Sequence, residues 1–152
     1  MSSNGRVQTA AVWDTTWGSY SSTDYGNTWV RSFSTASSIQ NNAMNSDGKI
    51  QTLLGWSNGE IFYSSDYGAN WTQSSSSVGS QARGIAMSSD GRIQTATSTA
   101  GISVSTDFGV SWTLKDANAG RQYYGVAMSS DGKIQTAIIN GSSGSSGIFC
   151  FN

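Results

Sequence analysis

The carboxylates best placed for chemistry recur in a fixed turn motif. The pattern Ser-x-Asp-x-Gly, with Trp three residues after the Gly, occurs three times. In such a turn the Asp can accept backbone N–H bonds, the Gly supplies a positive φ, and the Trp covers the boundary between repeats. The residues are Asp24, Gly26 and Trp29, then Asp66, Gly68 and Trp71, then Asp107, Gly109 and Trp112. Three full copies in register are too many to arise by chance.

Aromatic side chains form a second group of candidates, where the repeats differ. Trp13 and Trp56 hold the same place in their repeats, just after the second strand-like run. A Trp ring offers an apolar face to a sugar ring, and polar neighbours can bond its hydroxyl groups. The alternative is that the Trp rings pack over the blade rim and the Tyr rings along an inner strand. The candidate ligand-binding residues are Trp13, Asp14, Trp17, Trp56, Asn58, Glu60, Arg121, Tyr123 and Tyr124.

These candidates belong to a long internal repeat. The segment Met-Ser-Ser-Asp-Gly-Arg-Ile-Gln-Thr at 87–95 returns with small changes at 1–9, 44–52 and 128–136, so its glycines fall 43, 43 and 41 residues apart. A period near 43 residues, with short strand-like runs and Gly-containing turns, is typical of a propeller blade. We predict an all-β propeller of four-stranded antiparallel blades, with about 3.5 repeats in the chain. It forms one domain: a partial blade at 1–31, blades at about 40–72 and 82–113, and a partial blade at 122–152.

The Asp-containing motif resembles the Asp-box, or BNR repeat, of sialidases, sortilin-type receptors and other β-propellers. The resemblance covers nearly the whole chain, although the fourth copy stops before its Asp. It implies that the Asp-containing turns serve the fold on the face opposite the binding site. The Ser-Asp-Gly turns should share that face because each strand reversal changes sides, which leaves the variable loops as the binding face.

Two further features of the repeat concern the scaffold. An Asp-Gly or Asn-Gly pair joins the first and second strands, which predicts a tight hairpin with both central residues at positive φ. A glutamine recurs in the second strand of every repeat, so we expect its amide to bond a neighbouring backbone group. The four glutamines are Gln8, Gln51, Gln94 and Gln135.

The amino-acid composition limits the classes of ligand and partner that the chain can bind. Only 11% of residues are charged, the net charge is −1, and no run of Lys or Arg occurs, which argues against nucleic acid. Without His, and with Cys150 as the single Cys, the chain offers few metal ligands, so we expect no metal and no cofactor. The sequence predicts a soluble chain without signal peptide or membrane insertion, and leaves the cellular site open.

Two classes of function stay open. One is a non-catalytic, lectin-like module that binds glycans. The other is a structural or interaction propeller, such as a virion or surface component or a selected or designed assembly fragment. A sialidase-type glycosidase is less favoured, because the chain lacks the Arg-Ile-Pro motif of that family and Glu60 is its sole Glu. Unpaired strands at both ends predict a homo-oligomer, most simply a dimer that completes the ring.

Overall fold

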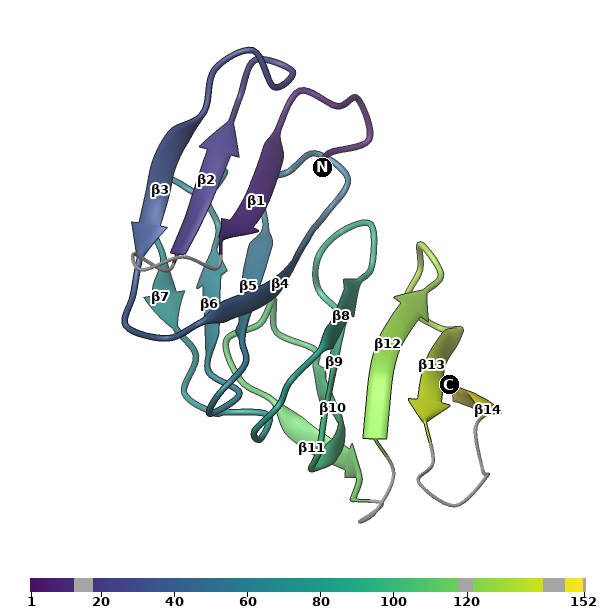
Figure 1. The fold of residues 1–152 in the computed structure, drawn as a ribbon. Coiled ribbons are helices and arrows are strands. Elements are labelled where there is room, and N and C mark those ends of the chain that lie inside the picture. Colours follow the sequence, from purple (N-terminus) through teal and green to yellow (C-terminus); the bar gives the residue numbers. More distant parts are fainter. Residues whose placement is uncertain (13–17, 118–121, 141–146, 152) are drawn as a thin grey trace.

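The computed structural model describes residues 1–12, 18–117, 122–140 and 147–151, which contain strands and turns but no helix. In these ranges no helix is long and apolar enough to cross a membrane. The described residues form fourteen strands in four antiparallel sheets, which follow one another along an arc (Figure 1). The predicted all-β architecture of propeller blades is confirmed.

The sheets are named blades 1 to 4 in chain order. Blade 1 contains β1 (Gln8–Val12), β2 (Gly18–Ser22) and β3 (Val30–Ser34). Blade 2 contains β4 (Ile39–Met44), β5 (Gln51–Gly55), β6 (Ile61–Ser64) and β7 (Thr72–Gln73). Blade 3 contains β8 (Gly84–Met87), β9 (Gln94–Ser98), β10 (Gly101–Ser105) and β11 (Thr113–Asp116). Blade 4 contains β12 (Gln122–Met128), β13 (Gln135–Asn140) and β14 (Gly147–Phe151).

The order of the strands runs from the inside of the arc outward. The first strands of blades 2, 3 and 4 are neighbours, because β4 contacts β8 and β8 contacts β12. In the described residues, the three strands of blade 1 correspond to the second, third and fourth strands of blade 2, and the three strands of blade 4 correspond to the first, second and third.

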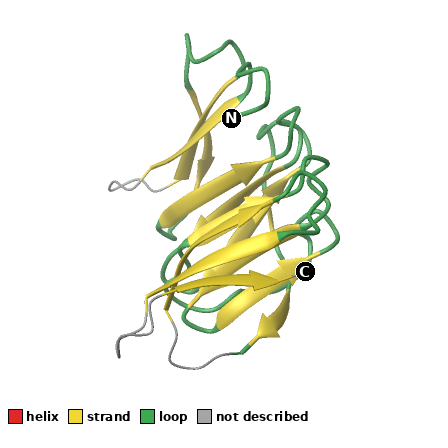
Figure 2. Cartoon of the chain, turned by 90° about the vertical axis from the view of Figure 1, so that its right-hand side faces the viewer, coloured by secondary structure: helices red, strands yellow, loops and turns green. Residues whose placement is uncertain are grey.

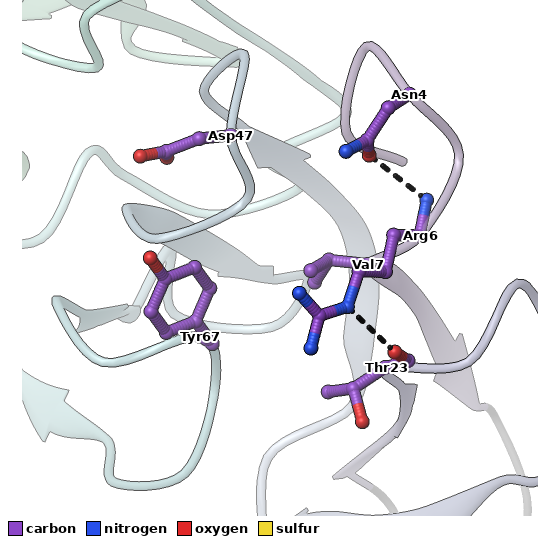
Figure 3. Close-up of a pocket in the computed structure, with 6 residues that line it drawn as sticks. All are labelled: Asn4, Arg6, Val7, Thr23, Asp47 and Tyr67. Carbon is purple, nitrogen blue, oxygen red and sulfur yellow. Dashed lines mark hydrogen bonds between the residues drawn. The ribbon is translucent and has the colours of Figure 1, made fainter.

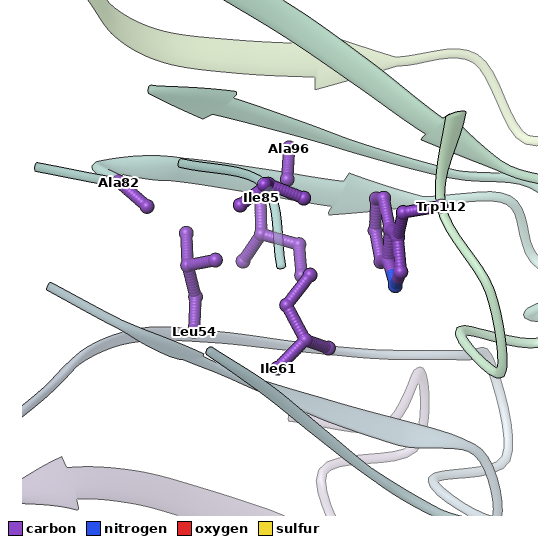
Figure 4. Packing of buried hydrophobic residues seen from close by; sticks show 7 residues of the cluster. Leu54, Ile61, Ala82, Ile85, Ala96 and Trp112 are labelled. Carbon is purple, nitrogen blue, oxygen red and sulfur yellow. The ribbon is translucent and has the colours of Figure 1, made fainter. Parts of the chain in front are cut away.

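The apolar core is divided among the seams between blades. Between blades 2 and 3, Leu54 and Ile61 pack against Ile85, Ala96 and Trp112 (Figure 4). A second cluster joins blades 3 and 4, and a third joins blades 1 and 2. Each unit therefore buries its faces against its neighbours, as repeat proteins do, and stability depends on blade-to-blade contact.

The repeated glutamines also cross these seams. Each side-chain amide donates to the carbonyl of the glycine three residues earlier, at 2.8–3.0 Å, which confirms the expected backbone bond. Three of them also accept a bond from the Thr hydroxyl of the preceding blade, which the sequence did not indicate. These pairs are Thr9 with Gln51, Thr52 with Gln94, and Thr95 with Gln135. One side-chain amide thus binds the turn of its own blade and the Thr hydroxyl of the preceding blade.

A backbone ladder runs parallel to these side-chain bonds. The N–H of Ser3 donates to the carbonyl of Ser46 at 2.7 Å, Ser46 to Ser89 at 3.0 Å, and Ser89 to Ser130 at 2.8 Å. Every bond has its donor in the earlier blade and its acceptor in the later one. The ladder therefore gives the arc a direction.

The turns divide between two faces, as predicted (Figure 2). In each Asp-containing turn, the aromatic residue before the glycine donates its backbone N–H to a backbone carbonyl in the turn between the first two strands of the same blade. The Tyr67 N–H, for example, donates to the Lys49 carbonyl at 3.1 Å. On the other face, the backbone N–H of Trp56 donates to the Ser38 carbonyl at 2.8 Å, and the backbone N–H of Thr99 donates to the Ser80 carbonyl at 3.2 Å. We call this second surface, formed by β5–β6 and β9–β10 hairpins and blade crossovers, the loop face.

The Ser-Asp-Gly turn differs from its sequence-based prediction. In the turn between β4 and β5, Gly48 has a positive φ of 81°, whereas Asp47 does not. The Gly48 N–H bonds the Asn45 carbonyl, and the Asp47 carboxylate accepts the N–H of Lys49 at 2.8 Å. The predicted two-residue hairpin with both central residues at positive φ is therefore wrong, because Asp at this position caps a longer connection with its side chain.

Candidate functional site

The three Asp turns, residues 22–29, 64–71 and 105–112, use their carboxylates internally. In blade 2, Asp66 accepts the backbone N–H of Asn70 at 2.9 Å, its side-chain amide at 2.7 Å, and the Ser64 hydroxyl at 2.8 Å. Equivalent bonds hold Asp24 and Asp107. The carboxylates therefore order the turns.

These hydrogen bonds favour the charged carboxylates. The side-chain hydroxyl of Thr28, followed by its N–H and the Ser22 hydroxyl, lowers the pKa of Asp24 from 3.8 to about 2. Asn70 lowers the pKa of Asp66 by its side-chain amide and then by its N–H. For Asp107, desolvation raises the pKa, but bonds from Ser111 and Ser105 outweigh it and the net pKa is lowered.

The Asp turns hold a second residue in the left-handed region besides glycine. Tyr25, Tyr67 and Phe108 precede the glycines and have φ values of 64°, 63° and 64°. Two successive positive φ values and the bond from Ala69 N–H to the Asp66 carbonyl, 3.2 Å, describe a type I′ hairpin turn. The sequence-based reasoning had assigned a positive φ only to the glycine.

The loop face carries a cluster that joins three blades. The guanidinium carbon of Arg83 lies 4.7 Å from the Trp56 ring centroid and 4.1 Å from that of Tyr124. Trp56 follows β5 in blade 2, Arg83 precedes β8 in blade 3, and Tyr124 lies in β12 of blade 4. Such cation–π contacts hold the three side chains together at the inner ends of the blades.

Arg83 was not among the predicted ligand-binding residues. Within the described ranges its guanidinium makes ring contacts but no hydrogen bond or ion pair. The sequence shows only that Arg83 lies at the end of a crossover between blades. It gives no sign that Arg83 contacts Trp56, which lies 27 positions earlier.

The other predicted residues are distributed unevenly. Asn58 is exposed beside Trp56, and the Glu60 carboxylate accepts a bond from the Ser37 hydroxyl. Tyr124 is exposed, and its hydroxyl donates to the Gln122 side chain at 3.2 Å. Four predicted residues lie outside the described ranges: Trp13, Asp14, Trp17 and Arg121.

Tyr123 belongs to the core between blades 3 and 4. Its side chain is almost fully buried with Ile102, Ala137 and Ile139, and its hydroxyl donates to the Asp116 carboxylate at 2.7 Å. Inner-strand packing, the alternative considered for this residue, is the geometry found. Its ring is therefore not available as a binding surface.

A shallow pocket lies on the opposite face, between blades 1 and 2 (Figure 3). It has a volume of about 480 Å³ and is lined by Asn4, Arg6, Val7, Thr23, Asp47 and Tyr67. Arg6 donates from Nε to the Thr23 carbonyl at 3.2 Å. The lining is therefore built from repeated turn residues that the sequence indicated as scaffold.

The fold and its repeated seams define the class of the protein as a β-propeller, present as an arc of four blades. No family model and no curated protein matches the chain.

Solved structures share the fold at low identity. The GH74 xyloglucanase from Xanthomonas campestris has a TM-score of 0.71 and 13% identity, over 95% of this chain and 27% of its own. The Niastella koreensis GH74 enzyme has a TM-score of 0.67 and 18% identity, over 89% of this chain and 24% of its own. YCF48 bound to D1 peptide has a TM-score of 0.56 and 15% identity, over 95% of this chain and 58% of its own. The chain thus spans about a quarter of these GH74 enzymes, and the likeness shows the fold alone.

Proposed function

We propose that the chain is a non-catalytic propeller module that binds glycans through its loop face. The observation that supports this is the cluster of Trp56, Arg83 and Tyr124. Aromatic rings with a guanidinium beside them combine apolar surface with planar N–H donors, which suit the ring, hydroxyl groups or carboxylate of a sugar. The Asp turns then serve the scaffold, as in the Asp-box propellers that the sequence resembles.

Two features favour binding without catalysis. A sialidase-type reaction needs a Tyr nucleophile beside a carboxylate that can reach the substrate. Tyr123 and Asp116 form such a pair, but Tyr123 is buried in the seam between blades 3 and 4. Glu60, the sole glutamate, already accepts a bond from Ser37.

A glycan array with the purified chain tests this proposal. We expect saturable binding to at least one glycan, weakened about tenfold or more by Trp56→Ala and by Arg83→Ala. Phe108→Ala, which removes an exposed ring from the opposite face, is the matched control and should bind normally. A folded protein that binds no glycan, or equal losses in all three variants, would contradict the proposal.

A second candidate is an interaction propeller that associates with itself. It is supported by exposed apolar side chains on the outer surfaces of blades 1 and 4, among them Trp29, Ile138 and Ile148. The neighbour YCF48, described as bound to a peptide, makes partner binding on such a scaffold plausible. A homodimer that completes the ring is the form of association we propose.

A further inference from the structure

We infer that the two ends of the arc bind each other in a second copy of this chain. Blade 4 of one copy packs against blade 1 of the other, head to tail, and two such contacts close a ring of two copies. This inference rests on the self-association proposed above and names its surfaces. Both end surfaces repeat, without a neighbour, one half of the seams inside the arc.

At the seam between blades 2 and 3, the first half is an apolar cross-strand pair that faces the next blade. In blade 2 this pair is Leu54 and Ile61, opposite each other on β5 and β6 and fully buried against blade 3. Ile138 and Ile148 are opposite each other at the equivalent positions of β13 and β14. They are 59% and 76% exposed. Blade 4 therefore presents a surface that blade 2 buries.

A side chain in the Ser-Asp-Gly turn extends this surface. The residue two positions after the turn glycine packs against the turn glycine of the next blade. A Cβ placed on Gly48 would meet the Val7 Cβ at 2.6 Å, and the pairs Ile50 with Gly91 and Ile93 with Gly132 repeat this contact. Ile134 meets no equivalent turn glycine among the described residues and is 63% exposed, whereas a Cβ placed on Gly5 would meet no atom within 4 Å. Ile134 and Gly5 are the two separated halves of the same contact.

The second half of a seam is the Trp of the Asp turn, which faces the preceding blade. Trp112 is 8% exposed because it packs with Leu54 and Ile61 of blade 2. The Trp71 ring lies 5.8 Å from the Phe33 ring of blade 1. Trp29, in blade 1, has no preceding blade among the described residues and is 42% exposed. It is positioned to cover Ile138 and Ile148 of a second copy.

Polar groups at the two ends are complementary as well. At each internal seam a Thr hydroxyl of the earlier blade donates to a Gln Oε1 of the later blade. Blade 4 ends this series with the donor Thr136, and blade 1 begins it with the acceptor Gln8. The backbone ladder likewise ends at Ser130 and begins at Ser3. Donors at one end therefore match acceptors at the other.

This complementarity is heterologous, since blade 4 matches blade 1 and not another blade 4. A heterologous contact forms a closed ring when its rotation closes. Two copies, each an arc, are the smallest ring in which every end is covered. The ring then contains two identical contacts related by a twofold axis.

The first test measures mass by light scattering, in reductant because Cys150 is exposed. We expect the unaltered chain at micromolar concentration to have twice its mass of 16.0 kDa. Ile138→Glu and Trp29→Glu should each weaken association at least about tenfold, since each breaks both contacts of the ring. Leu114→Glu, an exposed apolar position on β11, is the control and should leave the mass unchanged. Circular dichroism confirms that each variant is folded.

The second test mixes the two weakened variants. A head-to-tail contact predicts that Ile138→Glu and Trp29→Glu chains associate with each other, because one intact contact remains between the Trp29 variant's blade 4 and the Ile138 variant's blade 1. A monomeric unaltered chain would overturn both self-association and this interface. A dimer unaffected by both substitutions, or no association on mixing, would overturn the interface and leave self-association standing. Assemblies of more than two copies would overturn the ring of two.

Discussion

At the residue scale, one glutamine amide connects three parts of the structure. The Gln94 side chain donates to the Gly91 carbonyl at 3.0 Å and accepts from the Thr52 hydroxyl at 2.7 Å, and both side chains are fully buried. A buried polar group is costly only when it lacks a partner. The pair is therefore a directed polar contact within the buried seam, beside the Asp-turn glycine Gly109.

Removing the Thr52 hydroxyl should show how much the hydrogen bond to Gln94 contributes to stability. Thr52→Val keeps the side-chain shape but leaves the Gln94 Oε1 without its partner, so the free energy of unfolding should fall by about 1–3 kcal/mol. Thr113→Val, at an exposed position on β11, is the matched control and should change little. Urea unfolding measures both, and equal stabilities for the two variants would contradict the proposed role of the hydrogen bond.

The Asp turns should make stability depend on acid. Because the pKa of Asp24 is about 2 in the folded chain, below its ordinary 3.8, the charged form stabilises the fold above about pH 4, and this contribution is lost as pH falls toward 2. The lowered pKa values of Asp66 and Asp107 act in the same direction. We expect the melting temperature to be nearly constant from pH 7 to 5 and to fall between pH 4 and 2. The decline should be shallower in an Asp24→Asn, Asp66→Asn double variant, and an equally steep one would exclude these turns as its source.

At the scale of the blade, identical motifs acquire different roles from their neighbours. Trp29, Trp71 and Trp112 occupy the same position in the Asp turn. Their burial increases along the chain: Trp29 has no preceding blade among the described residues, Trp71 contacts Phe33 of blade 1, and Trp112 packs against Leu54 and Ile61 of blade 2. The strand sequence alone therefore does not determine the energetic weight of a motif.

Substituting each Trp by Ala should reproduce this gradient. Trp112→Ala opens the seam between blades 2 and 3 and should cost about 3 kcal/mol or more, whereas Trp29→Ala should cost under about 1 kcal/mol. Trp71→Ala should fall between them. Thermal melts in an Ile138→Glu background measure these values without self-association. An equal loss for Trp29 and Trp112 would contradict the seam assignment.

Local sequence patterns, such as residues 87–95, were sufficient to predict the period of the repeat and the order of its strands. The cluster around Arg83 was missed because Trp56 and Tyr124 reach it from two other blades, and no pattern within one repeat records that contact. The turn at Asp47 was wrong because its side chain caps the connection, which dipeptide composition does not distinguish from a two-residue hairpin.

At the scale of the whole molecule, self-association and stability should be linked. A ring of two copies buries end surfaces that are exposed in the single arc, so the folded state is favoured by mass action. The melting temperature of the unaltered chain should therefore rise with protein concentration, and that of Ile138→Glu should not. Differential scanning fluorimetry over a hundredfold concentration range checks this, and a concentration-independent melt in both would contradict the link.

The one-way backbone ladder from Ser3 to Ser130 also bears on how such a chain can grow. Each repeat carries a donor toward the next repeat and an acceptor toward the previous one. A tandem gene duplication therefore yields a unit that already fits on either side of its parent, before any compensating mutation. The same polarity explains why repeats can stay nearly identical in sequence, since every copy needs the same two edges.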